Sequence, residues 1–370
     1  MRIRIAIPVL LVLGVAWAQQ TPVPPAAATP AQQPAASQAT LDLGQALKRA
    51  YAQGTALANA QTNLSNAQQQ LKAVQADPST LIVQRTQAEQ TAALDAVTVE
   101  STKLQVLQSV VSAYLALYEA QQNGALAQAQ LDLANKDLDV AQAKFNNGNA
   151  TALSVSQART AQQSAQQSLA NAQAKVPVAE AQLATLLGVT NLGSVTVAPP
   201  PDFPKIDVKL ADLQKGLLER LPSVVQAKQA VDVYTLQVKL SDNDYTPRMT
   251  YQTAKTSLDN AQRTLDTAQQ NAATSVANAY QAALNTFANI AISQQNLHNS
   301  QQVLAQDQAA YQAGTVAAIQ VQSDQVNVAS AEYSLLQAVD TYRNAVVTLS
   351  VSAGQDLTGL VVPATSGGGG

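Results

Sequence analysis

Few side chains in this sequence could carry out chemistry. The chain has one histidine, His298, and no cysteine, so it has no thiol nucleophile and only one imidazole for acid–base work or metal binding. His298 follows Leu297 in a helix-favouring stretch, where a solvated or seam-edge histidine is commoner than a ligand or a base. Asp and Glu residues are scattered rather than paired, and no Gly-rich phosphate loop or metal-ligand spacing occurs. These patterns predict a protein that is not an enzyme, with no catalytic residue, cofactor or metal.

The charge pattern also gives little sign of a binding site. Asp242 and Asp244 form the nearest approach to an acidic cluster, at a break between helix-favouring runs, and a solvated turn is a better interpretation there than a calcium site. A formal net charge of −3 and an isoelectric point near 5.2 give no basic footprint for nucleic acid, so we expect no nucleic-acid partner. Four tyrosines could line a substrate path, although aromatic residues at helical spacing more often pack in helix seams: Tyr114, Tyr118, Tyr280 and Tyr311.

Two stretches of the sequence share one plan. Residues Tyr311 to Val321 read Tyr-Gln-Ala-Gly-Thr-Val-Ala-Ala-Ile-Gln-Val, and residues Phe145 to Val155 read Phe-Asn-Asn-Gly-Asn-Ala-Thr-Ala-Leu-Ser-Val. In each, an Ala- and Gln-rich helical run ends at an aromatic residue, meets a glycine able to adopt positive φ, and restarts as another helical run. Each stretch is therefore predicted to be the tip of a helical hairpin, with Gly314 and Gly148 at the turns.

A constant offset relates these stretches and much of the chain around them. Gly148 and Gly314 differ by 166 positions. The same offset relates three other pairs: Val155 and Val321, Tyr114 and Tyr280, and Gly188 and Gly354. Near the N-terminal ends the offset changes by only one position. We interpret the chain as a tandem duplication of one long helical unit.

The two ends differ from the rest of the chain. A basic start, an apolar run from Ile5 to Val15 and the small-x-small pattern Ala16-Trp17-Ala18 predict a secretory signal peptide over residues 1–18. The run is too short for a membrane anchor that is retained. Residues 19–40, rich in Pro, Ala and Gln, are predicted to be a disordered leader, and residues 357–370 a flexible tail. Without cysteine, the exported chain has neither a lipoprotein anchor nor a disulfide.

Composition and periodicity favour long packed helices over a compact core. Hydrophobic residues make up 46% of the chain but aromatic residues only 4%, and charged residues 12%. Frequent alanine lets helices approach closely along a long contact. Leu57, Leu64 and Leu71 mark a heptad stripe. Farther on, two stripes are offset by five residues, or about 140°, as expected of a helix with neighbours on both sides: Leu131, Leu138 and Phe145 form one stripe, and Leu126, Leu133 and Val140 the other.

Breaks in the pattern divide each repeat into three helical pieces. In repeat 1 (residues 41–190) we expect helices over about 43–77, 81–145 and 152–187, and in repeat 2 (residues 210–356) over about 221–240, 253–311 and 317–352. Residues 191–209, with prolines at 199, 200, 201 and 204, are predicted to be an extended linker. The predicted fold class is all-α, with tandem long helical hairpins forming coiled-coil staves of an α-barrel and little or no β-strand.

Several motifs together resemble the TolC-like outer-membrane efflux proteins. They are the paired tips of the form aromatic-x-x-Gly-x-x-x-x-hydrophobic-x-Val, the Val110 to Gln121 run Val-Val-Ser-Ala-Tyr-Leu-Ala-Leu-Tyr-Glu-Ala-Gln, the ending Leu186-Leu187-Gly188, and the entry Leu41-Asp42-Leu43-Gly44-Gln45-Ala46-Leu47. The resemblance covers about residues 41–360. Each motif alone is weak, and their tandem arrangement makes the resemblance specific.

The resemblance implies a function and a set of partners. Members of that family are exported trimers that serve as exit ducts of drug-efflux pumps and type I secretion systems. It implies a homotrimer that engages a periplasmic adaptor and an inner-membrane transporter. An outer-membrane or envelope partner is a further expectation, because a duct must enter the outer membrane or dock on something that does. Adaptor docking would fall on the hairpin tips, at Phe145, Gly148, Val155, Tyr311, Gly314 and Val321.

The sequence departs from the family at both Pro-containing breaks. The family inserts a two-strand membrane hairpin between each break and the long helix that follows. A membrane strand needs about 9–11 residues, whereas only Thr80–Val83 and Arg248–Tyr251 could be strand here. The β-barrel hairpins are therefore predicted to be absent.

A second departure concerns the periplasmic mouth. In the family, the mouth is often ringed by acidic side chains six and nine positions after the second tip glycine, with a basic residue two positions after it. Gln320, Ser323 and Val316 occupy these positions here, and Asp324 lies beside them. Gln320, Ser323 and Asp324 are therefore the candidates for a polar, neutral lumen constriction.

Two functions fit these observations. The first is a TolC-like periplasmic tunnel component of an efflux or type I secretion pathway, a passive conduit in a trimeric α-barrel. The second is a structural or spacer protein of the cell envelope that lacks the barrel and has no transport role. In both cases we expect an exported protein, in the periplasm and associated with the outer membrane or envelope.

Overall fold

The computed structural model describes residues 40–193 and 195–360 of the 370-residue protein. The predicted signal peptide, residues 19–39 of the predicted leader and residues 361–370 of the predicted tail lie outside the described residues. The elements, in chain order, are β1 (Thr40–Leu41), α1 (Leu43–Gln53), α2 (Thr55–Ala76), α3 (Ile82–Asn146), α4 (Ala152–Leu186), β2 (Thr196–Val197), α5 (Leu210–Gln214), α6 (Leu217–Arg220), α7 (Pro222–Ser241), α8 (Arg248–Gln312) and α9 (Ala318–Ala353). The prediction of an all-α fold of long hairpins with little strand is confirmed.

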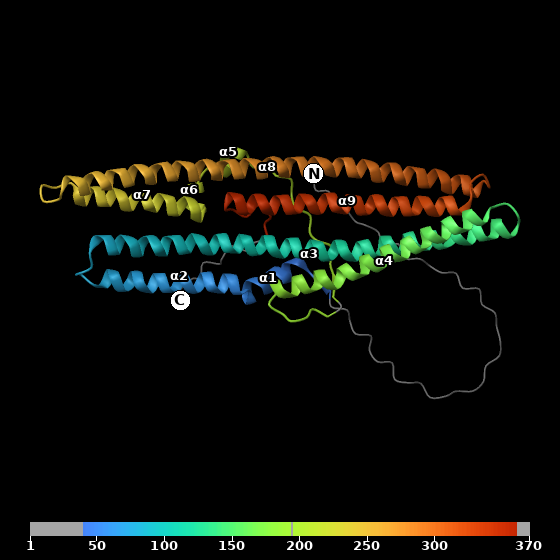
Figure 1. The fold of residues 1–370 in the computed structure, drawn as a ribbon, viewed down its shortest axis with the longest axis horizontal. Coiled ribbons are helices and arrows are strands. Elements are labelled where there is room, and N and C mark those ends of the chain that lie inside the picture. The colour runs from blue at the N-terminus through green and yellow to red at the C-terminus, as the bar shows by residue number, and fades with distance from the viewer. Residues whose placement is uncertain (1–39, 194, 361–370) are drawn as a thin grey trace, which may run out of the picture.

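The long helices lie side by side in a layer (Figure 1). Helices α3 and α8 each contain 65 residues, which corresponds to about 97 Å at 1.5 Å per residue. Around the hairpin tips the order across the layer is α4, α3, α9, α8; toward the opposite end it is α2, α3, α7, α8. Helix α3 therefore has neighbours on both sides, as the two offset stripes predicted, whereas α8 and the α2/α4 pair form the two edges.

Short turns join the helices where the sequence has its Pro-containing breaks. Residues 77–81 link α2 to α3, and residues 242–247 link α7 to α8. Asp77 Oδ1 accepts from Ser79 N at 2.9 Å and from Ser79 Oγ at 2.7 Å, a local side-chain turn. Neither described connection contains a strand, and α8 already begins at Arg248, five residues before the expected Thr253. The prediction that neither break holds a two-strand hairpin is confirmed.

The first predicted helix is interrupted, which the sequence pattern had missed. Gly54 separates α1 from α2 with φ −69° and ψ 121°, and its N–H still donates to Ala50 O at 2.8 Å. A Cβ at this position would lie 2.3 Å from that oxygen. Only glycine permits this close approach. The prediction of a single helix over 43–77 is therefore wrong at Gly54, where the helix is interrupted.

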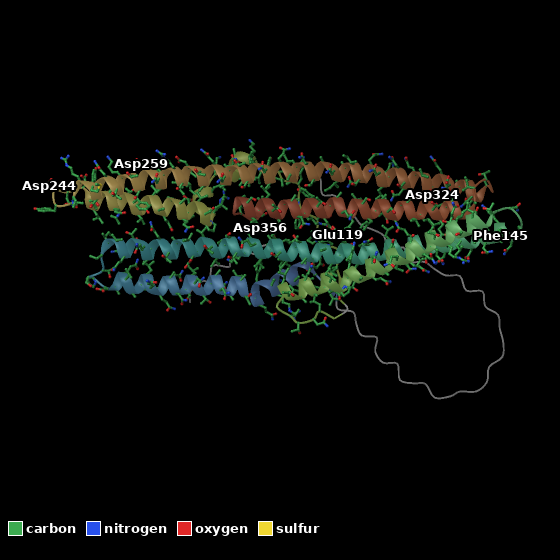
Figure 2. All side chains as sticks on the ribbon, viewed as in Figure 1. Glu119, Phe145, Asp244, Asp259, Asp324 and Asp356 are labelled. Carbon is green, nitrogen blue, oxygen red and sulfur yellow. The ribbon has the colours of Figure 1, made fainter. Side chains whose placement is uncertain are left out.

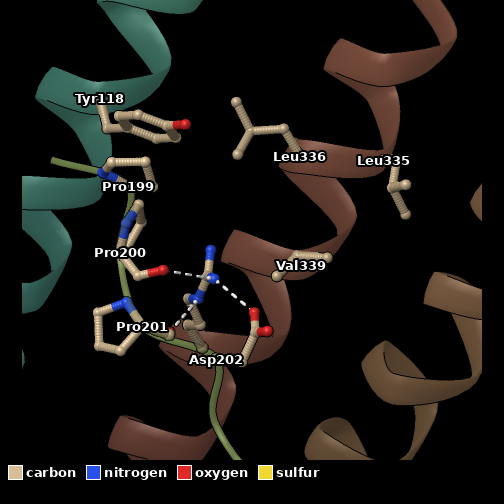
Figure 3. Close-up of a pocket in the computed structure, with 9 residues that line it drawn as sticks. Tyr118, Pro199, Pro200, Pro201, Asp202, Leu335, Leu336 and Val339 are labelled. Carbon is tan, nitrogen blue, oxygen red and sulfur yellow. Dashed lines mark hydrogen bonds and ion pairs between the residues drawn. The ribbon is translucent and has the colours of Figure 1, made fainter. Parts of the chain in front are cut away.

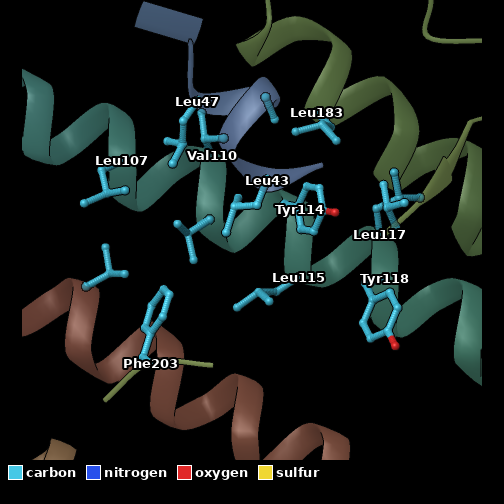
Figure 4. Packing of buried hydrophobic residues seen from close by; sticks show 14 of the residues in the cluster. Leu43, Leu47, Leu107, Val110, Tyr114, Leu115, Leu117, Tyr118, Leu183 and Phe203 are labelled. Atoms are coloured by element: carbon cyan, nitrogen blue, oxygen red, sulfur yellow. The ribbon is translucent and has the colours of Figure 1, made fainter. Parts of the chain in front are cut away.

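The largest cluster of buried hydrophobic residues joins α1, α3, α4, α9 and the linker, and Figure 4 shows part of its packing. The first turns of α1, the central part of α3, the end of α4 and the linker meet there, and Tyr114 is fully buried. The two-residue parallel pairing of β1 with β2 ties Thr40 to Thr196 beside this core. Toward the helix ends, buried positions are mostly alanine, as at Ala254, Ala261, Ala67 and Ala172. The alanine-rich composition therefore serves close helix contact. The hairpins are anchored by this cluster and by a second one, in which Leu213, Val276 and Leu349 are fully buried.

Candidate functional site

Both hairpin tips are closed by the same backbone hydrogen bonds. In each, the glycine N–H donates to the carbonyl oxygen three residues earlier at 2.9 Å. The next residue donates to the carbonyl five residues earlier, at 2.7 Å in the α3–α4 tip and 2.9 Å in the α8–α9 tip. This pair of bonds is the Schellman motif, which satisfies carbonyl groups left without partners at a helix C-terminus.

Backbone conformation explains the glycine at each turn. Gly148 and Gly314 both have φ 76°, in the left-handed region that other residues adopt only at a cost. A Cβ at either position would meet no atom within 4 Å, so space is not the constraint. The turns are structurally required, and the docking role assigned to them stays a prediction.

The tips leave several large apolar side chains in contact with solvent. Phe145 is 42% exposed and Tyr311 is 50% exposed, at equivalent places in the last turns of α3 and α8. Val155 is buried and Val321 is half-buried, so these two predicted tip residues pack inward. The sequence reasoning had missed Leu153, which is 66% exposed. Leu153 lies two residues before Val155 and therefore on a different face of α4, and this spacing could have predicted its exposure from the sequence.

A shallow groove runs beside the second tip. The groove is lined by residues of α3, by Tyr311 of α8 and by the first turns of α9. Its lining combines apolar and polar side chains: Lys136, Asp139, Val140, Tyr311, Ile319, Val321 and Gln325, among others. Figure 2 shows Phe145 and Asp324 toward this end of the molecule and Asp244 at the opposite end.

The three candidate constriction residues have different surroundings. Gln320 is exposed and Ser323 is half-buried, whereas Asp324 is only 3% exposed. Gln320 Nε2 donates to Asp324 Oδ1 at 3.3 Å, and Asn327 Nδ2 donates to the same oxygen at 3.5 Å. Asp324 is therefore held by amides of its own helix.

Asp324 also forms a carboxyl pair with Asp307 of α8. The hydrogen bond to Asp324 is the main cause that raises the pKa of Asp307 above its usual value, and burial and the charge of Asp324 add to it. Asp307 lies 7 residues before Gly314 and Asp324 lies 10 after it. The sequence reasoning had missed Asp307, because the helix register that brings the two carboxyls together is a tertiary property.

A second polar cluster joins the proline linker to α9 (Figure 3). The Arg343 guanidinium donates to Pro201 O at 3.0 Å, Pro200 O at 3.0 Å and Asp202 Oδ1 at 3.1 Å. Its Nη1 also donates to Asp340 Oδ1 at 2.5 Å. A small cavity lies beside it, between the prolines, Tyr118 and the leucines of α9. No motif had pointed to Arg343.

The tyrosines mostly pack. Tyr114 and Tyr118 belong to the buried cluster, and Tyr280 is half-buried. The Tyr114 hydroxyl lies 2.9 Å from Leu41 O and 2.7 Å from Ala198 O, and its single hydrogen can serve one of them at a time. Seam packing is therefore the better interpretation for the buried pair.

The other polar candidates from the sequence are exposed. His298 is exposed and contacts Gln302 at 3.1 Å, and Asp242 and Asp244 lie exposed in the α7–α8 turn. No group of three or more His, Cys, Asp or Glu residues there is arranged to hold a metal ion. None of the described helices has a stretch apolar and long enough to span a bilayer.

A protein-family comparison matches most of the helical part of the chain. The model described as "Outer membrane efflux protein" matches residues 80–189 and 248–355. The two matched ranges each contain one long helix, its tip and the returning helix. No curated protein sequence gives a significant match.

Three solved structures of similar fold are those of outer-membrane proteins. The outer membrane protein VceC of Vibrio cholerae is 15% identical with a TM-score of 0.64, over 85% of this chain and 96% of that one. The MtrE outer membrane channel of Neisseria gonorrhoeae is 16% identical with a TM-score of 0.62, over 85% and 89%. The CmeC outer membrane channel of Campylobacter jejuni is 14% identical with a TM-score of 0.61, over 84% and 85%. At these identities the likeness establishes the fold.

Proposed function

Because the chain belongs to the outer membrane efflux protein family, we propose that it forms a TolC-like periplasmic tunnel, a passive conduit in an efflux or type I secretion pathway. In this proposal three copies close into an α-barrel, and each copy supplies one layer of helices as its share of the wall. The chain is exported and works in the periplasm, in association with the outer membrane or envelope. Its two repeats, residues 41–190 and 210–356, are the two hairpins of that wall.

The observation that carries this proposal is the open layer of helices. Its two edges are formed by α8 on one side and by α2 with α4 on the other; the short helices α5 and α6 also contact α8, and no further long helix of the described residues covers either edge (Figure 1). Such a layer cannot enclose a lumen alone. Contact between the α8 edge of one copy and the α4 edge of the next is head-to-tail, and repeated contacts of that type form a closed ring when the rotation from copy to copy adds up to a full turn.

Side chains on both edges support a contact between copies. On α4, Val178 is exposed, and on α8, Ile292 and Val303 are exposed. Burying an apolar side chain of this size stabilises an association by about 1.5–3 kcal/mol. At the tips, Phe145, Tyr311 and Leu153 offer further exposed apolar surface, which suits docking of a periplasmic adaptor.

Disulfide crosslinking tests the ring directly, since the chain has no cysteine of its own. Ala170 on α4 and Ile292 on α8 are both exposed and both lie 22 residues from their tip glycine. Oxidised Ala170→Cys/Ile292→Cys protein should give covalent dimers and trimers, and the ladder should end at the trimer. Each single-cysteine variant is the matched control. Monomers alone would refute the ring, and a longer ladder would refute the subunit number.

A transport assay separates a conduit from a structural spacer. Deleting the gene should raise cellular accumulation of a fluorescent efflux substrate, and the full-length chain should restore export. A variant with Phe145 and Tyr311 both changed to aspartate should assemble, by the same crosslinking test, but export poorly. Unchanged accumulation after deletion, with rings still formed, would favour the spacer.

A further inference from the structure

A buried ionic cluster lies where the two hairpins and the linker meet. Asp340 of α9 is 0% exposed and Arg343, one turn later, is 5% exposed. Arg343 binds two linker carbonyls and Asp202, as described above, and so fastens residues 200–202 to α9. Glu119 of α3 lies half-buried on the other side of the contact between α3 and α9, against Asp340. The cluster therefore joins groups from three segments, α3, α9 and the linker.

The charges in this cluster do not balance when every group is ionised. The cluster contains three carboxylates, Glu119, Asp340 and Asp202, and one guanidinium, that of Arg343. Asp202 is 47% exposed and is partly screened by water, but Asp340 is not. With both Glu119 and Asp340 ionised, Asp340 Oδ2 has no hydrogen-bond donor within the described part of the chain. A buried acceptor of this kind is costly.

A proton on Glu119 removes both problems. A protonated carboxyl group has an O–H donor, which an ionised one lacks, and it can donate to Asp340. One proton also leaves Asp340 and Arg343 as a neutral buried pair. We propose that Glu119 and Asp340 share one proton across the α3–α9 contact, and that this proton acts as a reversible clasp. While the proton is bound, the two hairpins and the linker are held together. When it is released, their junction loosens.

The surrounding groups favour this protonation. Facing the pair are Arg343 and Tyr333 from α9, Tyr118 from α3 and Asp202 from the linker. Burial, followed by the charge and hydrogen bond of Asp340, raises the pKa of Glu119 to about 7. Burial raises the pKa of Asp340 to about 6, against the opposing effect of Arg343. Arg343 thus keeps the charge on Asp340 and leaves the proton on Glu119.

The direction of the pH effect follows. Both carboxyl groups have higher pKa values in the folded protein than in the unfolded chain, so the folded state binds more protons between about pH 4.5 and 7. The stabilisation is complete below the ordinary pKa of a glutamate and is lost as the pH rises through the folded value. This clasp does not depend on what the protein transports.

Hydrogen exchange of the full chain at pH 6 and pH 8 tests the clasp. After correction for intrinsic exchange rates, the amides of residues 335–347 should exchange roughly tenfold faster at pH 8 than at pH 6. This factor is smaller than the full pKa shift of Glu119 would give, because Glu119 is partly exposed to water. In Glu119→Gln the amide donates at every pH, so the difference should disappear. Asp137→Asn, at an exposed carboxyl on α3, is the matched control and should behave as the unchanged protein. An unchanged pH difference in Glu119→Gln would overturn the proposal.

A second measurement needs no variant. Infrared spectra at pH 6 should contain the C=O stretching band of a protonated carboxyl group, although exposed carboxyl groups are ionised at this pH. Labelling glutamate with ¹³C at the carboxyl carbon should shift that band. A spectrum without the band, or glutamate labelling that shifts no part of it, would overturn the proposal even if Glu119→Gln failed to fold.

Discussion

Replacing Arg343 by methionine should destabilise the protein more than any surface substitution. The methionine keeps much of the side-chain volume but removes the charge that faces the fully buried Asp340. Breaking a buried ion pair by removing one partner costs about 3–5 kcal/mol, because the remaining charge is left uncompensated. The carbonyl groups of Pro200 and Pro201 also lose their donors, at roughly 1 kcal/mol each if water does not replace them. We therefore expect a loss of about 4 kcal/mol or more at pH 8.

The loss should shrink as the pH falls. Asp340, whose pKa is already raised to about 6 by burial, will have a still higher pKa once Arg343 is gone, since an opposing cation no longer favours its charged form. At pH 5 it takes up a proton and the uncompensated charge disappears. The variant should therefore recover part of its stability between pH 8 and pH 5, by more than the unchanged protein does.

Urea unfolding followed by the helical circular dichroism signal, at one protein concentration, measures both effects. Arg263→Met removes an exposed arginine of α8 and should cost less than 0.5 kcal/mol. Adding Asp340→Asn to Arg343→Met should restore part of the loss, because the buried charge is removed with its partner. A loss below about 1 kcal/mol at pH 8, or no recovery in the double variant, would refute the reasoning.

Three further predictions concern single contacts. Gly314→Ala should lower the free energy of unfolding by about 1–2 kcal/mol, because φ is 76° there while space for the methyl group is open. Tyr114→Phe should cost about 1 kcal/mol, because its hydroxyl is the donor that Leu41 O and Ala198 O share. Asp307→Asn should raise the melting temperature at pH 8 but not at pH 5, because the pKa of Asp307 is raised by its hydrogen bond to Asp324 and ionisation of the pair at high pH is unfavourable.

Each of these has a matched control in the chain. Gly124→Ala, in the interior of α3 with open space around its Cβ, should be neutral or slightly stabilising; an equal loss at both glycines would contradict the backbone argument. Tyr245→Phe removes a hydroxyl from a side chain that is 97% exposed and should have no effect. Asp259→Asn, at an exposed carboxyl of α8, should leave the pH profile of melting unchanged. If Asp259→Asn changed the pH profile of melting as Asp307→Asn does, the change in overall charge, rather than the Asp307–Asp324 pair, would explain the result.

Local patterns in the sequence determined the helices and their turns. The apolar stripes of α2 and α3 and the placement of Gly148 and Gly314 depend on neighbours within a few positions, so they can be read from the chain in order. The same patterns carried the resemblance that the family match confirmed. The break at Gly54 was not predicted, because an isolated glycine in an alanine-rich helix gives no local sign of a close backbone approach.

The tertiary structure alone decided which side chains meet across helices. Glu119 and Asp340 are 221 positions apart, and Arg343 reaches a linker about 140 positions earlier in the sequence. Their meeting depends on the order of α3 and α9 in the layer and on the axial register between them. In the sequence each is one more charged residue on a mostly polar helix. Only burial, which comes from packing α3 against α9 beneath the linker, turns these ordinary charges into a coupled cluster whose protonation affects the fold.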